Sequence, residues 1–149
     1  MLGKLDHNQM EALLKSQAWG RIGCNADGIT YVIPVNYVYD GVNIYAHSDE
    51  GMKINMMRKN PEVCFEVDII ENMVNWQSVI AWGRFEEITD IAEQEQTMQK
   101  LINNIVPLIG ETAHPSHGIT DRESDIGTFI NLIVYKIHLR WKTGRYEKK

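Results

Sequence analysis

The chain has 149 residues, of which 44% are hydrophobic and 23% are charged, and its formal net charge is −5. These values are typical of one globular domain, so residues 1–149 are treated as a single domain. The acid excess argues against nonspecific binding of nucleic acid, and a bound phosphate would therefore need a local pocket. No apolar run approaches the roughly 20 residues of a membrane span, and residues 1–10 lack the apolar region of a signal peptide. We expect a cytoplasmic protein with reduced cysteines and no membrane or nucleic-acid partner.

Six segments are predicted to be β-strands, because apolar residues alternate within them or turn residues bound them. They cover residues 19–24, 29–39, 42–47, 63–70, 75–88 and 128–141. Asp40-Gly41 is a strong hairpin signal between the second and the third. Pro34 has no N–H to donate, so the second strand must lie at a sheet edge or carry a bulge. Hairpins dominate, which favours a mainly antiparallel sheet arranged as a barrel or sandwich.

Three helices are expected beside this sheet. Two of them open with capping boxes, at Asp6 with Gln9 and at Asp90 with Glu93. The second helix is expected to start at Ser48 and to stop before Pro61. Residues 110–128 are expected to form a loop. His114 and His117 of this loop have no further Cys or His nearby, so no metal site is expected.

Residues 45–53 are the best candidate for a phosphate site on physical grounds. They join a strand to a helix start, where free backbone N–H groups and the helix dipole favour an anion. Ser48 adds a hydroxyl donor and Lys53 adds a full positive charge. Asp49 and Glu50 would repel a phosphate unless they point away. Ser48 could also be only the N-cap of the helix.

Two strands carry residues that would suit a planar heterocycle. The strand period places Trp76, Ser78, Ile80 and Trp82 on one face, and Gln77, Val79, Ala81 and Gly83 on the other. Paired tryptophans beside polar groups suit a ring, although they are also typical of a core or a dimer contact. Asn36 needs partners for its amide unless it faces solvent. Gly83 leaves room for a ligand or for another backbone.

These segments together resemble the FMN-binding split-barrel superfamily of pyridoxamine 5'-phosphate oxidase, and most closely its nitroimidazole-resistance branch. The resemblance is carried, in order, by GRIG (20–23), YVIPVNYVYDG (31–41), IYAHS (44–48), GMK (51–53), RKNPEVCF (58–65), SVIAWGR (78–84) and TGR (143–145). It implies a mainly β fold, a six-stranded antiparallel split β-barrel with a few flanking helices. It also implies a homodimer with FMN bound between the subunits.

The resemblance further implies roles for individual residues. The phosphate and ribityl chain would lie near His47, Ser48 and Lys53. The isoalloxazine ring would lie against one strand at Pro34, Val35, Asn36 and Tyr37, and against a second strand at Trp76, Gln77, Ser78 and Val79. From the C-terminal end of either chain would come Trp141, Lys142 and Arg145. Lys142 or Arg145 is expected to stabilise the reduced, anionic flavin.

One departure from the family pattern concerns the phosphate. The branch often has an aromatic residue followed by Arg where this chain has Trp76 followed by Gln77. Lys53 and the backbone N–H groups would then carry more of the binding, with Arg58 or Arg145 as compensating cations. The pyridoxamine phosphate-binding pattern of the oxidase itself is not recognisable.

The leading interpretation is an FMN-dependent oxidoreductase that reduces a small aromatic or nitro-aromatic compound. The alternatives on the same fold are a non-catalytic flavin carrier or sensor, and a protein that binds haem or a deazaflavin. His47 could be a proton donor, a cofactor ligand or a dimer contact. The sequence assigns no catalytic residue.

Overall fold

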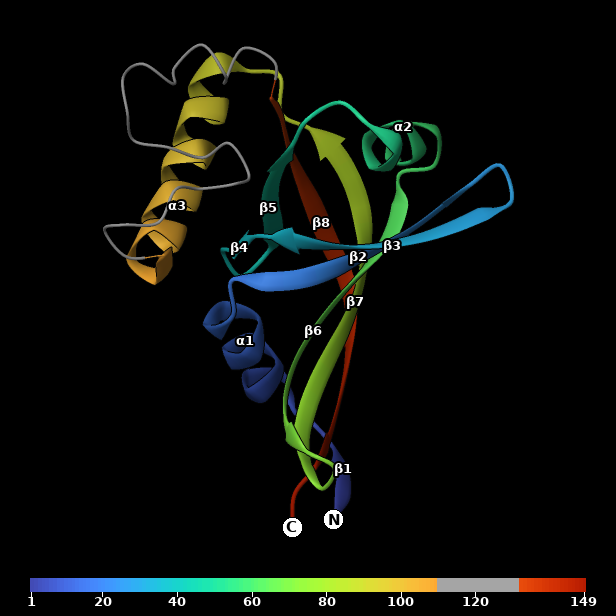
Figure 1. Ribbon diagram of the computed structural model, residues 1–149, viewed down its shortest axis with the longest axis vertical. Coiled ribbons are helices and arrows are strands. Elements are labelled where there is room, and N and C mark those ends of the chain that lie inside the picture. Colours follow the sequence, from blue (N-terminus) through green and yellow to red (C-terminus); the bar gives the residue numbers. More distant parts are fainter. Residues whose placement is uncertain (110–131) are drawn as a thin grey trace.

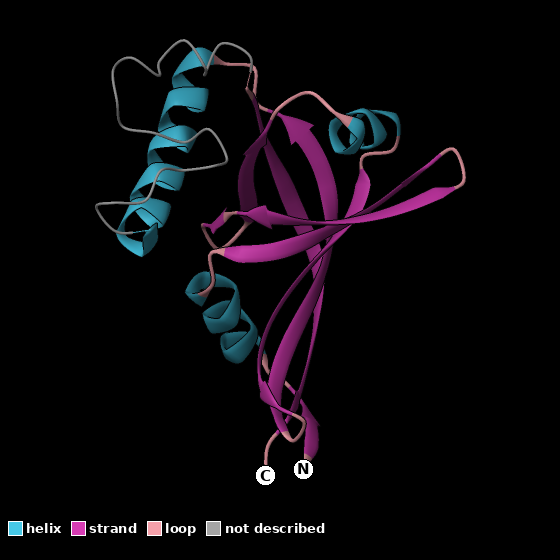
Figure 2. Ribbon diagram, viewed as in Figure 1, coloured by secondary structure: helices cyan, strands magenta, loops and turns pink. Residues whose placement is uncertain are grey.

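Eight strands in the described part of the chain form one antiparallel sheet that curls into a split barrel (Figures 1 and 2). The computed structural model describes residues 1–109 and 132–149. The strands are β1 (Leu2–Lys4), β2 (Trp19–Ala26), β3 (Ile29–Asn36), β4 (Val38–Tyr39), β5 (Asn43–Ser48), β6 (Glu62–Asn72), β7 (Asn75–Glu87) and β8 (Ile133–Glu147). The helices are α1 (His7–Ser16), α2 (Met52–Lys59) and α3 (Ile91–Ile109). The mainly β fold expected from the sequence is confirmed.

The strand order is β3-β2-β6-β7-β8-β5-β4, and β1 pairs with β8 outside this path. β6, β7 and β8 are long and extend well beyond the barrel as a ribbon, at whose end both chain termini lie (Figure 1). Because β3 is the last strand of the order, Pro34 lies at a sheet edge, as its missing N–H predicts. The expected loop over residues 110–128 lies wholly outside the described residues.

The described sheet has eight strands where six were predicted, because β1 was not expected and one predicted strand is divided into β3 and β4. The segment expected as one strand over residues 29–39 is interrupted at Tyr37, whose N–H donates to the carbonyl of Ala18 rather than along the sheet. The last strand continues to Glu147, where a polar tail was expected, because it is paired by β1 and by β7 up to that residue. Pairing on both sides therefore holds a polar sequence in an extended conformation.

The helix starts follow the capping pattern in one case of three. Asp6 accepts from the N–H of Gln9 and Gln9 returns the bond to the N–H of Asp6, both at 2.8 Å. Asp90 accepts from the N–H of Glu93 at 2.9 Å, but the Glu93 carboxylate binds the Lys136 ammonium at 3.1 Å. The expected start of α2 at Ser48 is wrong, since the helix begins at Met52 with Gly51 as its N-cap. In the second capping box, the ion pair with the distant Lys136 thus replaces the return bond from Glu93 to Asp90.

The main core lies inside the barrel and beneath α1 and α2, and a second, smaller apolar cluster lies between α3 and strands β5 and β8. In β6, Val63, Phe65 and Val67 are buried and alternate with more exposed residues, as predicted. Cys24 is buried in this core, whereas Cys64 lies on the opposite face of the sheet, so both cysteines are free. Within the described residues, no helix is both long and apolar enough to cross a membrane.

A hydrogen bond from Tyr37 links α1 to the core, and removing this bond tests the fold. Its fully buried hydroxyl donates to the carbonyl of Leu14 at 2.6 Å. Tyr37→Phe should lower the free energy of unfolding by about 1–3 kcal/mol, because the carbonyl loses its donor inside the core. Urea unfolding measures this change. Tyr31→Phe is the matched control, since no hydrogen bond of the Tyr31 hydroxyl is found in the described part of the chain. Equal stability of the two variants would contradict the assigned role.

Candidate functional site

One face of the sheet, here called the outer face, is turned away from the main core. It is formed by alternate residues of β3, β2, β6, β7 and β8, which the strand registers place side by side. Of the residues predicted to contact a cofactor, it carries Pro34, Asn36, Trp76, Ser78, Trp141 and Arg145. The outer face therefore brings together residues from both predicted cradle strands and from the C-terminal strand.

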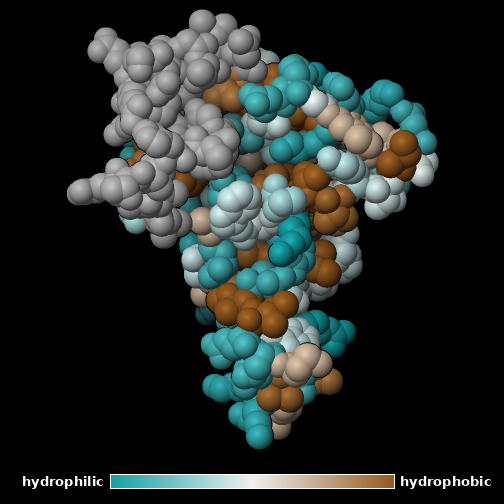
Figure 3. All heavy atoms as spheres, in the orientation of Figure 1, coloured by the Kyte–Doolittle hydropathy of each residue, from teal (hydrophilic) through white to brown (hydrophobic). Residues whose placement is uncertain are grey.

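Large apolar side chains stand on the outer face. Trp19 is 59% exposed, Val32 63%, Ile80 38% and Trp141 61%. The rings of Trp82 and Trp141 stack with centroids 4.4 Å apart and an interplanar angle of 23°. Figure 3 shows one side of the molecule, on which hydrophobic residues reach the surface beside hydrophilic ones. Exposed apolar area of this kind marks a binding surface.

Charged residues stand in the middle of the outer face. β2 and β6 separate β3 from β7, so the two predicted cradle strands are not neighbours. Between them, the Arg21 guanidinium lies 3.3 Å from the Glu66 carboxylate and 3.5 Å from that of Asp68. Burial, and then the adjacent Asp68 carboxyl, raise the pKa of Glu66 to about 7. A ligand lying across this face would meet these groups as well as the predicted ones.

The predicted phosphate residues gather at the start of α2. His47 and Ser48 end β5, and Lys53 lies in the first turn of the helix. The first helical bond runs from the N–H of Asn55 to the carbonyl of Gly51, so the preceding N–H groups have no acceptor within the helix. The alternative role of Ser48 as N-cap is wrong, because its hydroxyl donates to the carbonyl of Asp49. Lys53 is half-buried, which lowers the pKa of its ammonium.

The acidic residues before α2 affect this site less than their number suggests. Glu50 points to Arg58, whose guanidinium nitrogens lie 2.8 and 2.9 Å from its carboxylate oxygens. Arg58 also binds Glu87. Arg58 is therefore engaged with carboxylates, and its contribution is to neutralise Glu50 rather than to meet a phosphate. Lys53, in contrast, forms no ion pair within the described residues. The negative charge of Asp49 acts on Lys53 at longer range and partly offsets the lowering of its pKa by burial.

The other predicted residues lie on the inner side of the sheet. Val35, Tyr37 and Val79 belong to the buried core, so only their backbone could face a ligand. Lys142 is 3.0 Å from the Glu11 carboxylate of α1, and is turned away from Trp141. Gln77 faces the space between the ribbon and α1. One chain alone therefore does not assemble the whole predicted set.

Gly83 provides room for backbone and not for a ligand. A Cβ atom at this position would lie 2.4 Å from the carbonyl oxygen of His138 on the neighbouring strand β8. The register of β7 and β8 shifts between Trp82 and Gly83, as in a β-bulge. Of the two uses that the sequence leaves open for this glycine, the structure shows close strand approach.

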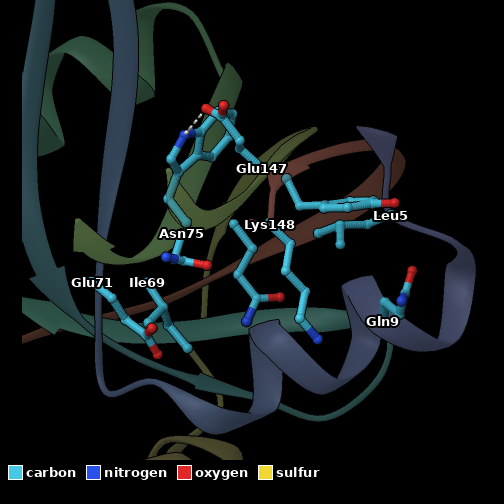
Figure 4. A pocket seen from close by; sticks show the side chains of 10 residues that line it. Leu5, Gln9, Ile69, Glu71, Asn75, Glu147 and Lys148 are labelled. Atoms are coloured by element: carbon cyan, nitrogen blue, oxygen red, sulfur yellow. Dashed lines mark hydrogen bonds between the residues drawn. The ribbon is translucent and has the colours of Figure 1, made fainter. Parts of the chain in front are cut away.

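An open pocket of about 430 Å³ lies between α1 and the far end of the ribbon (Figure 4). Figure 4 shows Gln9 of α1 facing Ile69 and Glu71 of β6 across this space, with Lys148 between them. The Trp76 indole is held at its rim by a 3.2 Å bond to Glu147. Sequence reasoning missed this pocket, because nothing local places the first helix beside the last residues of the chain.

A second hollow, of about 320 Å³, lies on the outer face. Its lining includes Val32, Cys64, Trp82 and Arg140. Elsewhere in the described part of the chain, no three His, Cys, Asp or Glu residues gather as a metal site would require. His114 and His117 lie outside the described residues.

The strand order and the flanking helices define a split-barrel fold. A family model described as Pyridoxamine 5'-phosphate oxidase matches residues 6–137. The chain therefore belongs to the pyridoxamine 5'-phosphate oxidase family.

Solved structures with the same fold include proteins that are named as flavin-binding. A FAD-binding protein from Mesorhizobium loti has a TM-score of 0.76 at 24% identity, with 99% of each chain covered. A candidate 5-nitroimidazole antibiotic resistance protein from Bacteroides thetaiotaomicron has a TM-score of 0.74 at 20% identity, covering 98% of this chain and 87% of the other. The flavocytochrome Anf3 from Azotobacter vinelandii has a TM-score of 0.72 at 18% identity. The match covers 97% of this chain and 68% of the flavocytochrome chain. At these identities the likeness shows the fold.

A curated relative adds little on activity. The uncharacterized protein RA0666 of Rhizobium meliloti is 27% identical over 84 residues, which is 56% of this chain and 56% of that protein. The match thus spans about half the length of that relative.

Proposed function

We propose that the protein binds FMN between two copies of the chain and reduces a small aromatic or nitro-aromatic compound. The phosphate would lie at the start of α2, and the ring on the outer face. The observation that carries the proposal is Lys53, a half-buried ammonium without an ion pair among the described residues, beside free N–H groups of a helix start. Such a combination favours a dianion, because charge-assisted bonds to phosphate are strong.

The residues present fit a flavin in two respects. The phosphate end has a cation, helix N–H groups and a hydroxyl at Ser48, while Arg58 neutralises the nearby Glu50. The ring end has exposed indoles and polar groups at Asn36 and Ser78 on the same face. A flavin cofactor is supported by two of the similar structures, which are named a FAD-binding protein and a flavocytochrome.

A second copy of the chain is part of the proposal. The outer face exposes apolar side chains that would be costly to leave in water, and one chain offers the ring only one wall. Covering this face with a second copy would enclose the ring and exclude water. In such an arrangement Trp141 and its stacked neighbour Trp82 would lie at the interface.

The chemistry would come from the flavin, which transfers hydride or single electrons when bound. The chain's own residues would hold the phosphate at Lys53, orient the ring against the outer face and exclude water from it. His47 ends β5 beside the phosphate residues, and its imidazole is the proposed proton carrier. We assign no catalytic residue.

The absorption spectrum of the purified protein, with mass analysis of any released small molecule, tests the cofactor. Flavin bands and the mass of FMN are expected. A Soret band, or failure of the protein to bind added FMN, would contradict the proposal. Oxidation of NAD(P)H in the presence of a nitro-aromatic acceptor then tests the activity. Bound FMN without such turnover would overturn the oxidoreductase part and favour a carrier or sensor.

A further inference from the structure

The open pocket between α1 and the far end of the ribbon lies where the inner face of the sheet leaves the core. On this face Val67 of β6 and its partner Val79 of β7 are fully buried in the main core. The next row outward is Ile69, Gln77 and Tyr146, side by side on β6, β7 and β8. This row is only half-buried and lines the pocket of about 430 Å³ (Figure 4). Small-molecule sites usually have volumes of roughly 300–1,000 Å³, so the pocket is of ligand size.

Two polar side chains of this row have no hydrogen-bond partner in the described part of the chain. They are the Gln77 amide and the Tyr146 hydroxyl. The indole of Trp76 in the same lining is engaged, since it donates to the Glu147 carboxylate at 3.2 Å. Polar groups that are withdrawn from water usually have a partner. The Gln77 amide and the Tyr146 hydroxyl are therefore open to a bound molecule.

The register of the ribbon holds these two groups close together. Gln77 and Tyr146 are directly paired on neighbouring antiparallel strands, where Cβ atoms lie about 4.5–5.5 Å apart. A Cβ atom at Gly3 would lie 2.5 Å from a ring carbon of Tyr146, so the glycine lets this ring lie against the backbone of β1. An amide has donor and acceptor atoms side by side, and the hydroxyl can serve as either. The row thus offers paired donors and acceptors beside an aromatic ring and the aliphatic Ile69.

The charged groups of the pocket favour a neutral ligand over an anion. The lining contains the carboxylates of Glu71 and Glu147 and one ammonium, that of Lys148. Neither Glu71 nor Lys148 forms an ion pair within the described residues, and Figure 4 shows Lys148 between α1 and β6. Two carboxylates against one ammonium leave one uncompensated negative charge. A phosphate or carboxylate would therefore be repelled, whereas a neutral ring would not.

We propose that this pocket binds a small, neutral, planar heterocycle by an edge on which a hydrogen-bond donor lies beside an acceptor, as in a nucleobase or a ring carboxamide. The Gln77 amide pairs with that edge, in the way that glutamine pairs with adenine in nucleic-acid complexes. Leu5, Ile69 and the ring of Tyr146 contact the faces of the heterocycle, since stacking on aromatic and aliphatic side chains suits any flat ring. The inference assigns Gln77 to this pocket rather than to the flavin.

The pocket is separate from the proposed phosphate site of the same chain. Helix α2, which carries Lys53, and the far end of the ribbon lie at opposite ends of the molecule (Figure 1). The inference therefore does not need a bound flavin. Its test is carried out with and without FMN, so that the two proposals can fail independently.

Titration of the nitrogen-15-labelled full chain with uracil, adenine or nicotinamide, followed by proton–nitrogen NMR spectra, tests the inference. We expect at least one probe to shift the signals of the Trp76 indole N–H and the Gln77 side-chain amide, with one saturable dissociation constant. The probe that binds distinguishes a nucleobase from a ring carboxamide. Its counterpart with methylated N–H groups is the control ligand and should bind about tenfold more weakly, because it cannot donate to Gln77.

Gln77→Leu keeps the size of the side chain and removes its hydrogen bonds. It should raise the dissociation constant of the bound probe about tenfold. Tyr146→Phe is a second, milder variant and should raise it a few-fold. Gln99→Leu is the matched control, since this amide lies on α3 and binds Asn103 at 2.8 Å, and it should bind the probe as the unmodified chain does. Circular dichroism verifies that each variant is folded.

Any of four results would overturn the inference. They are no shift at millimolar concentrations of all three probes, equal binding of the methylated counterpart, equal affinities of Gln77→Leu and Gln99→Leu, and displacement of the probe by FMN. The last result would mean that the flavin ring itself occupies the pocket. A chain that binds FMN and none of the probes would remove only this inference, whereas a chain that binds a probe and no FMN would remove only the proposed cofactor.

Discussion

Lys53→Ala is expected to weaken FMN binding by about 1.5–3 kcal/mol, which is roughly a 10- to 150-fold rise in the dissociation constant. The reason is geometric. Lys53 lies in the first turn of α2, where the helix N–H groups are open, and it is half-buried without an ion pair among the described residues. Arg58 cannot replace it, since it is held by Glu50 and Glu87. Quenching of FMN fluorescence during titration measures the change.

Lys59→Ala is the control for this variant. It removes the same charge from the other end of the same helix, where the ammonium lies 2.7 Å from Asp27 and is exposed. Its FMN affinity should equal that of the unmodified chain. If both variants bind equally, or if Lys53→Ala binds FMN normally, Lys53 does not contact the phosphate.

Trp141→Glu is expected to convert the proposed dimer to monomers and to abolish flavin binding. Trp141 stacks on Trp82 and is one of the exposed apolar side chains of the outer face. Replacing it removes a large contact and places a carboxylate where an interface would bury it. Losses of about 2–4 kcal/mol are typical when a central aromatic anchor is removed. Sedimentation velocity measures the oligomeric state, and absorbance measures the bound flavin.

Ile91→Glu is the matched change on a different surface. Ile91 is 72% exposed at the start of α3, away from the outer face. It should leave both association and flavin binding unchanged. A Trp141→Glu monomer that still binds FMN with full affinity would show that the cofactor does not need the second copy.

Much of the fold could be predicted because its causes are local. Alternation of buried and exposed residues marks β6, and the missing N–H of Pro34 marks an edge strand. The capping box at Asp6 marks the start of α1. The same alternation could have sorted the site residues, since Val35 and Tyr37 alternate with Pro34 and Asn36. Only one of these sets can face a ligand.

The remaining features depend on contacts between distant parts of the chain. Lys142 forms an ion pair with Glu11. Glu93 forms an ion pair with Lys136 instead of completing its capping box. In both cases the partner is far away in the sequence, so no local pattern indicates it. The split at Tyr37 depends on Ala18 and Leu14. The stacking of Trp82 on Trp141 depends on strand order, which alternation alone does not give.

The central claim is that the flavin lies between two copies of the chain. FMN titration of the apoprotein, followed by sedimentation of the same samples, tests it most directly. The account predicts one FMN per chain, bound only in the fraction that sediments as a dimer. Stoichiometric FMN in a monomer, or a dimer that leaves FMN free in solution, would contradict it.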